Sequence, residues 1–217
     1  IYGFCYYHYW FNGKRLMDRP VKEILASGQP DFPFMLCWAN ENWSRNWDGK
    51  FRNILIEQHY SEEDDIEHMR YLCSKVFQDT RYIRIDGKPV FAIYRSNFFP
   101  NMKHTIDVWR KVAKEEYGIE LYLIRVENEP DFGPKYLDCG FDSAMDFQPL
   151  LMGEFNAWWK NLPFRIMNHL FKGKYQWFNK HFSYASYVKY RIKKPLADYK
   201  CFPCVSPGWD NSPRRKK

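Results

Sequence analysis

A chain of 217 residues is long enough to bury the core of one domain. It has no apolar run of about 18 residues, which excludes a membrane-spanning helix. Its 33 Lys and Arg residues outnumber its 26 Asp and Glu residues, for a net charge of +7, and much of the excess lies late in the chain. Clusters of Lys and Arg can attract nucleic acid or an anionic membrane surface. The chain has no nucleic-acid-binding motif, however, so a solvated face with a basic tail is the simpler interpretation.

The start of the chain lacks the pattern of an export signal. Its first residues, IYGFCYYHYW, have no basic leader and no small-residue cleavage site, and they begin inside a strand-like segment without an initiator Met. Six cysteines lie mostly in apolar segments, as expected for buried thiols in a reducing compartment. Cys201 and Cys204 have C-x-x-C spacing, but no second pair accompanies them. We therefore expect a fragment of a longer, cytoplasmic protein with reduced cysteines.

Aromatic residues make up 20% of the chain, including 9 Trp. A core of this size does not need so many tryptophans. An indole ring near polar residues suits stacking against a sugar, because the C–H faces of a sugar ring are apolar. The composition therefore indicates carbohydrate binding.

The first half of the chain alternates strand-like and helical segments. Residues 1–10 are apolar and aromatic, and a short helix with Pro20 in its first turn ends at Gly28. The run Phe32–Ala39 is continuously apolar, as in a strand covered on both faces. A second helix begins at Ser61, with Asp64 completing a capping box.

The same alternation continues in the second half. Strands are predicted at Val90–Tyr94, Leu121–Val126, Asp142–Phe147 and Cys201–Val205. Helices are predicted from Thr105, as the N-cap, to Gly118, at Pro134–Cys139 and at Ser186–Tyr199. Residues 150–184 break this rhythm and are interpreted as an aromatic-rich insertion.

Six strands alternating with helices indicate parallel βα units. Either a barrel or an open doubly wound sheet satisfies this pattern. A nucleotide-binding open sheet would show a glycine-rich turn after an early strand, and this chain has none. The fold class favoured is therefore α/β, a TIM-like (β/α)8 barrel of which residues 1–217 form a single, truncated domain with about six of the eight units.

Functional side chains of such a barrel gather where its strands end. The residues just past the predicted strands include carboxylates, amides, Arg and Trp. The candidate catalytic residues are Glu41, Glu127 and Asp146. The candidate substrate-binding residues are His8, Tyr9, Trp38, Asn40, Trp43, Trp47, Arg95, Trp209 and Asp210. Parallel strands end on one rim, so the central members of this set are predicted to converge on one pocket.

Each candidate has a structural alternative. Glu41 lies in WANENW, where desolvation by the flanking indoles would favour a general acid, but it could equally bond loop backbone. His8 is either a base, a sugar-hydroxyl partner or a packed core histidine. Arg95 either binds an anionic group or pairs with a carboxylate. The six histidines show no metal-ligand spacing, so neither a metal nor another cofactor is predicted.

Four segments carry a family resemblance. YGFCYYHYWFNGKRL, PDFPFMLCWANENWSRNWDG, DGKPVFAIYR and PCVSPGWDNSPRR, in this order, resemble the WbsX-type glycosyltransferase family. That family is found in O-antigen and capsule gene clusters and is related to glycoside hydrolase family 99.

The resemblance implies a (β/α)8 barrel that acts on glycans without a Rossmann domain. It also implies that the fragment is incomplete, because family members have an earlier strand and a final strand that ends in N-E-W-x-E-G, whose glutamates match the catalytic pair of the related hydrolases. Glu127-Asn128-Glu129 lacks that spacing. The main catalytic carboxylates are then expected outside these residues.

Two hypotheses follow. The first is an enzyme that transfers or cleaves glycosidic bonds during synthesis of lipopolysaccharide O-antigen or capsule, with transfer favoured and endo-acting hydrolysis as the alternative. The second is a non-catalytic glycan-binding module. The expected partner is a glycan or a lipid-linked oligosaccharide rather than nucleic acid, and peripheral contact with the inner membrane surface stays open.

Overall fold

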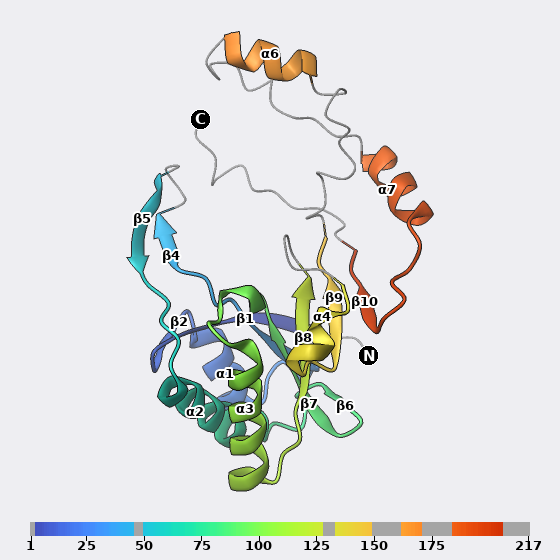
Figure 1. Cartoon of the computed structure of the whole chain (residues 1–217). Helices are drawn as coiled ribbons and strands as arrows, with labels where there is room; N and C mark the ends of the chain where they lie inside the picture. Colours follow the sequence, from blue (N-terminus) through green and yellow to red (C-terminus); the bar gives the residue numbers. More distant parts are fainter. Residues whose placement is uncertain (1–2, 46–49, 128–132, 149–161, 171–183, 206–217) are drawn as a thin grey trace.

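The computed structural model describes residues 3–45, 50–127, 133–148, 162–170 and 184–205. Six parallel strands form the centre of the sheet (Figure 1) and are adjacent in chain order. They are β1 (Phe4–Phe11), β3 (Phe34–Trp38), β7 (Lys88–Ile93), β8 (Tyr122–Glu127), β9 (Ser143–Asp146) and β10 (Cys201–Pro203). Each of these matches an expected strand, so the α/β class with a mostly parallel sheet is confirmed.

Four short strands were not expected from the sequence. β2 (Lys14–Leu16) pairs antiparallel with β1, and β6 (Arg84–Ile85) pairs antiparallel with β7. The two residues that connect β1 and β2, Asn12 and Gly13, have φ of 46° and 75°. This is the conformation that an Asn-Gly hairpin turn requires. β4 (Trp43–Arg45) and β5 (Lys50–Ile56) form a separate hairpin that extends away from the sheet (Figure 1).

The helices begin and end largely where local signals place them. α1 (Arg19–Ser27) ends at Gly28, and the Ser61 hydroxyl accepts a hydrogen bond from the Asp64 amide at the start of α2 (Glu62–Tyr71), which continues as a π-helical turn at Leu72–Val76. The remaining helices are α3 (Met102–Tyr117), α4 (Lys135–Cys139), α6 (Leu162–Leu170) and α7 (Tyr184–Lys193), and a 3-10 turn spans Ser96–Phe98.

Two helix boundaries differ from the sequence prediction. α3 is capped by Asn101, whose side chain accepts from the His104 amide, because the Thr105 hydroxyl instead donates to Asp65 of α2. α7 ends at Lys193 rather than Tyr199, since Pro195 cannot continue a helix. Most of the predicted insertion at 150–184 lies outside the described residues, apart from α6.

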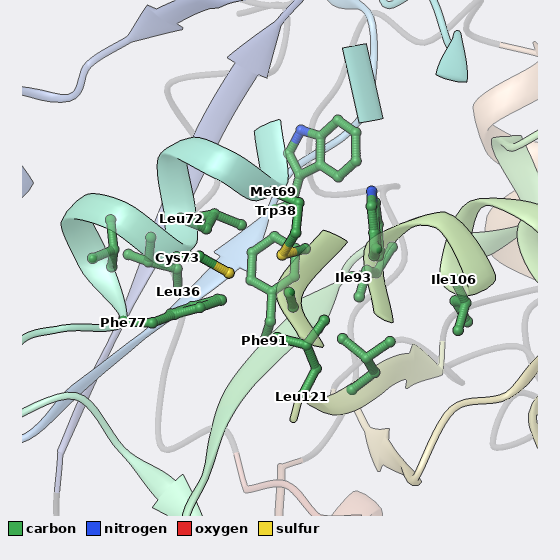
Figure 2. Close-up of a cluster of buried hydrophobic side chains, with 14 of the residues drawn as sticks. Leu36, Trp38, Met69, Leu72, Cys73, Phe77, Phe91, Ile93, Ile106 and Leu121 are labelled. Carbon is green, nitrogen blue, oxygen red and sulfur yellow. The ribbon is translucent and has the colours of Figure 1, made fainter. Parts of the chain in front are cut away.

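The helices α1 to α4 pack on one face of the sheet. The larger core cluster joins Leu36 of β3, Phe91 of β7 and Leu121, just before β8, to Met69 of α2 and Ile106 of α3. Figure 2 shows these side chains. The smaller cluster, on the other face, is built by strand residues alone: Cys37, Val90, Ala92, Tyr122, Ile124 and Val126. We call these two sides the helix-covered face and the inner face.

The sheet does not close on itself within the described residues. Its order runs from β10 at one edge to β1 and β2 at the other, and these edges do not pair. No closed barrel is found in this part of the chain, and the truncated (β/α)8 barrel predicted from the sequence is not confirmed. None of the helices in the described ranges is long and apolar enough to cross a membrane.

Candidate functional site

A carboxylate and a guanidinium meet where β3 and β7 end. The two strands are parallel, with Trp38 opposite Ile93, so the segments that follow them leave the sheet at the same edge. We call this edge, where the parallel strands end, the carboxyl edge. Arg95 Nε donates to Glu41 Oε1 at 2.6 Å. The Glu41 side chain is 41% exposed and that of Arg95 22%, so the pair lies at the surface with one side open to solvent.

Asn40 holds this pair in place. Its Nδ2 donates to the Arg95 carbonyl oxygen at 2.8 Å, and its Oδ1 accepts from the Arg95 amide at 2.8 Å. Its Nδ2 also contacts the Tyr60 hydroxyl at 3.1 Å, and that hydroxyl donates to the Asn40 carbonyl at 2.7 Å. Asn40 is fully buried, so it acts as a clamp between two strand ends, and this position does not support the expected contact with substrate.

An aromatic stack lies at the same edge. Trp43 of β4 stacks on Tyr9 of β1, with ring centroids 5.5 Å apart and planes 15° apart, and also lies parallel to Phe11 at 6.4 Å. Tyr9 and Trp43 are both half-buried. These two predicted substrate-binding residues therefore come together, and together they present apolar ring surface of the kind on which a sugar stacks.

A second aromatic row follows the inner face of the sheet. Tyr7, Tyr94 and Phe147 contact one another edge to face, with centroids 6.2 Å and 5.8 Å apart. Burial raises the pKa of Tyr7, so its hydroxyl is a neutral hydrogen-bonding group. The Arg95 guanidinium lies 5.0 Å from the centre of the Tyr94 ring, which joins this row to Glu41. Tyr94 and Phe147 were not among the predicted site residues. The sequence did carry a signal for them, because side chains two positions apart on a strand share a face, and Ala92 and Met145 lie on the inner face.

His8 and Trp38 point to the helix-covered face. His8 Nε2 lies 2.9 Å from His68 Nε2 of α2, and burial lowers the pKa of His8 to about 3. Trp38 is 1% exposed and packs edge-on against His68. Both side chains are therefore core groups in the described structure, and these positions do not support the expected contact with substrate.

Glu127 is enclosed by donors. It is 4% exposed, and its Oε1 accepts from Arg125 at 3.0 Å, from the Gly133 amide at 3.1 Å and from the Tyr199 hydroxyl at 2.8 Å. Its Oε2 lies 3.8 Å from Cys201 Sγ. A buried carboxylate held by this many hydrogen bonds is well suited to fix the segments around β8 and is enclosed away from a substrate at the surface.

Asp146 lies opposite Glu127 in the register of β8 and β9. Its carboxylate accepts from Gln148 and from Arg191 of α7. The Tyr187 hydroxyl of the same helix donates to Gln148. Asp146 therefore anchors α7 to the carboxyl edge of the sheet. Both of its carboxylate oxygens accept hydrogen bonds from the protein.

The remaining candidates, Trp47, Trp209 and Asp210, lie outside the described residues. Across the described ranges, no three or more His, Cys, Asp or Glu side chains are grouped so that they could hold a metal ion. Of the predicted pocket, the structure brings together Glu41, Arg95 and Asn40 in one group and Tyr9 with Trp43 in another.

Comparison with known proteins gives a consistent family. The family model described as "Glycosyltransferase WbsX" matches residues 1–217. The proteins called WxcX from two strains of Xanthomonas campestris pv. campestris are each 32% identical to this chain over 213 residues, which is 98% of this chain and 29% of their own length. The chain thus spans less than a third of these relatives. A solved structure described as "Glycoside hydrolase-like protein" aligns with 86% of this chain and 51% of its own, at 16% identity and a TM-score of 0.46.

Proposed function

Because this chain belongs to the WbsX glycosyltransferase family, we propose that it forms one wall of the active site of an enzyme that acts on glycosidic bonds of bacterial surface polysaccharide. The reaction proposed is glycosyl transfer in the synthesis of O-antigen or capsule. The substrate class is a glycan or a lipid-linked oligosaccharide. The family and its relatives support the carbohydrate class, and the site supports the chemistry.

The observation that carries this proposal is the Glu41–Arg95 pair beside two aromatic surfaces. Glu41 would act as acid or base at the glycosidic oxygen, and Arg95 would hold its carboxylate in one orientation. An indole stacked on a sugar ring, as Trp43 offers, contributes about 1 kcal/mol by analogy with aromatic pairs. These groups supply what a sugar-binding and proton-transferring site needs on one side of the substrate.

Enzymes that hydrolyse glycosidic bonds canonically use two carboxylates, and we propose that this enzyme does the same. Glu127 and Asp146 are each held by hydrogen bonds within the protein, so they are poor candidates for the second. We propose that it comes from the part of the full-length protein beyond this chain. The six parallel strands in chain order, with α1 to α4 on one face, also support a (β/α)8 barrel that further βα units complete.

One alternative has a specific observation in its favour. This alternative is a glycan-binding module without catalysis, which needs no catalytic carboxylate. At the carboxyl edge the described residues supply only one accessible carboxylate, Glu41, rather than a pair. Hydrolysis is the other alternative. It needs the same carboxylates and differs from transfer in that water, rather than a sugar hydroxyl, receives the glycosyl group.

Glu41→Gln in the full-length protein tests the proposal. Loss of general acid–base help should lower kcat about 10²- to 10⁴-fold while glycan affinity changes little. Trp43→Ala should instead weaken glycan binding about fivefold, which corresponds to about 1 kcal/mol. The matched control is Glu57→Gln, an exposed carboxylate just beyond β5, which should leave both quantities within about twofold.

The outcomes separate the candidates. If Glu41→Gln keeps kcat within a few-fold, Glu41 is a structural residue and the proposed role is refuted. If the wild-type protein binds glycan but forms no product with any donor or acceptor supplied, the binding module is favoured. Analysis of the products by mass spectrometry distinguishes a new glycosidic bond from a free reducing end.

A further inference from the structure

Helix α7 is attached to the sheet by the side that carries Tyr187 and Arg191. The Tyr187 hydroxyl donates to Gln148, and the Arg191 guanidinium donates to Asp146. These two residues are four positions apart, so they lie on the same side of the helix. Their partners stand at and just after the end of β9, at the carboxyl edge that also carries Glu41 and Arg95. The inward side of α7 is thereby fixed.

The opposite side of α7 combines lysine with exposed aliphatic surface. At about 100° per residue, positions 189, 192 and 193 lie away from the anchors. Lys189, Ile192 and Lys193 are all exposed, with 79% of Ile192 accessible. Leu196, just beyond the helix, is 87% accessible. We call these four residues the α7 patch.

The charge around the patch is predominantly positive. Residues 184–200 contain five basic residues, and Asp198 is the only acidic one. Basic side chains beside exposed aliphatic groups are the combination that binds the headgroup region of an anionic bilayer, because the lysines meet lipid phosphates while the aliphatic groups enter the acyl boundary. Nucleic acid would also attract the lysines, but its backbone offers no apolar layer to receive Ile192 and Leu196.

We propose that the α7 patch docks the protein on the surface of an anionic lipid bilayer. This inference goes beyond the proposed catalytic activity and does not depend on it. Its consequence is positional: Asp146 and Gln148 hold α7 at the carboxyl edge of the sheet, so docking brings that edge close to the membrane surface. A substrate carried on a lipid anchor would then reach the site without leaving the bilayer.

Sedimentation of the full-length protein with vesicles tests the proposal. Binding should be strong to vesicles of phosphatidylglycerol mixed with phosphatidylcholine, weak to phosphatidylcholine alone, and reduced by high salt. Lys189→Gln/Lys193→Gln should lower the partition coefficient about 30-fold, since each lysine near an anionic surface contributes about fivefold. Ile192→Ser/Leu196→Ser should lower it about tenfold through lost apolar burial.

The matched control is Lys75→Gln/Lys111→Gln, two exposed lysines on the π-helical turn after α2 and on α3, which should bind as the wild type does. Circular dichroism identifies any variant that fails to fold, and the single variant Lys189→Gln, with an expected loss of about fivefold, then replaces it.

The proposal is overturned if the wild type binds both vesicle types equally or neither. It is also overturned if the patch variants match the control on vesicles, including the case in which they lose affinity for an oligonucleotide instead. Turnover of a water-soluble oligosaccharide should be unchanged in the patch variants, so failure here is distinct from failure of the proposed activity.

Discussion

Asn40→Ala should release the Glu41–Arg95 pair from the sheet. The Asn40 amide forms three hydrogen bonds, two to the Arg95 backbone at 2.8 Å and one to the Tyr60 hydroxyl at 3.1 Å. Alanine removes all three hydrogen bonds and leaves the Arg95 amide without its Asn40 acceptor, while the Arg95 carbonyl still accepts from the Phe98 amide at 3.2 Å. Since each such loss costs about 1 kcal/mol, the local structure should be destabilised by about 3 kcal/mol.

Amide hydrogen exchange followed by mass spectrometry measures this local destabilisation directly. The Arg95 amide is protected by Asn40 Oδ1, so a loss of about 3 kcal/mol should speed its exchange about 100-fold if it exchanges through local opening. The peptide that covers the end of β7 should therefore lose protection, while peptides from α3 should not. Catalytic turnover should fall with it, because Arg95 no longer holds Glu41 in one orientation.

Asn97→Ala is the matched control, since this exposed asparagine lies two residues beyond Arg95. A change there should alter stability by less than about 0.5 kcal/mol. The reasoning is refuted if Asn40→Ala leaves exchange near Arg95 at the wild-type rate, or if Asn97→Ala changes it equally.

Three further predictions concern two buried ionisable groups and the cysteine thiols. Burial lowers the pKa of His8 to about 3, below its value of about 6.5 in an unfolded chain, so the free energy of unfolding should fall as the pH drops from about 6.5 toward 3. His8→Phe should flatten that slope by up to one proton, about 1.4 kcal/mol per pH unit, and an unchanged slope would contradict the buried neutral state. Burial raises the pKa of Asp65 to about 6 while Thr105 donates to it. Asp65→Asn should therefore stabilise the protein by about 1–2 kcal/mol at pH 8 and not at pH 4, and a gain at both would point to another cause. Finally, all six cysteines lie in the described ranges as free thiols, and titration of the unfolded protein without reductant should count six, whereas four would reveal a disulfide.

Local patterns in the sequence determined the elements and their order. Runs of apolar residues predicted all six parallel strands, and Ser61 with Asp64 predicted the start of α2. The Asn12-Gly13 pair is an equally local signal, for the turn of the β1–β2 hairpin. These features succeed because turn geometry and capping depend on a few neighbouring residues. The alternation of strands and helices then determined the α/β class and placed Glu41, Arg95, Tyr9 and Trp43 at one edge.

The face on which each side chain lies was decided by tertiary structure alone. Every residue of Phe32–Ala39 is apolar. Polar and apolar residues therefore do not alternate along this strand, and the sequence does not show which positions the helices cover. Only the packing of α2 and α3 determines which side chains of β3 lie on each face. Trp38 lies on the helix-covered face and Cys37 on the inner face. The enclosure of Glu127 likewise depends on tertiary structure, because Tyr199, which donates to it, is 72 residues away in the chain. Strand ends can be read from neighbouring residues, but burial and hydrogen-bond partners depend on segments that only the folded chain brings together.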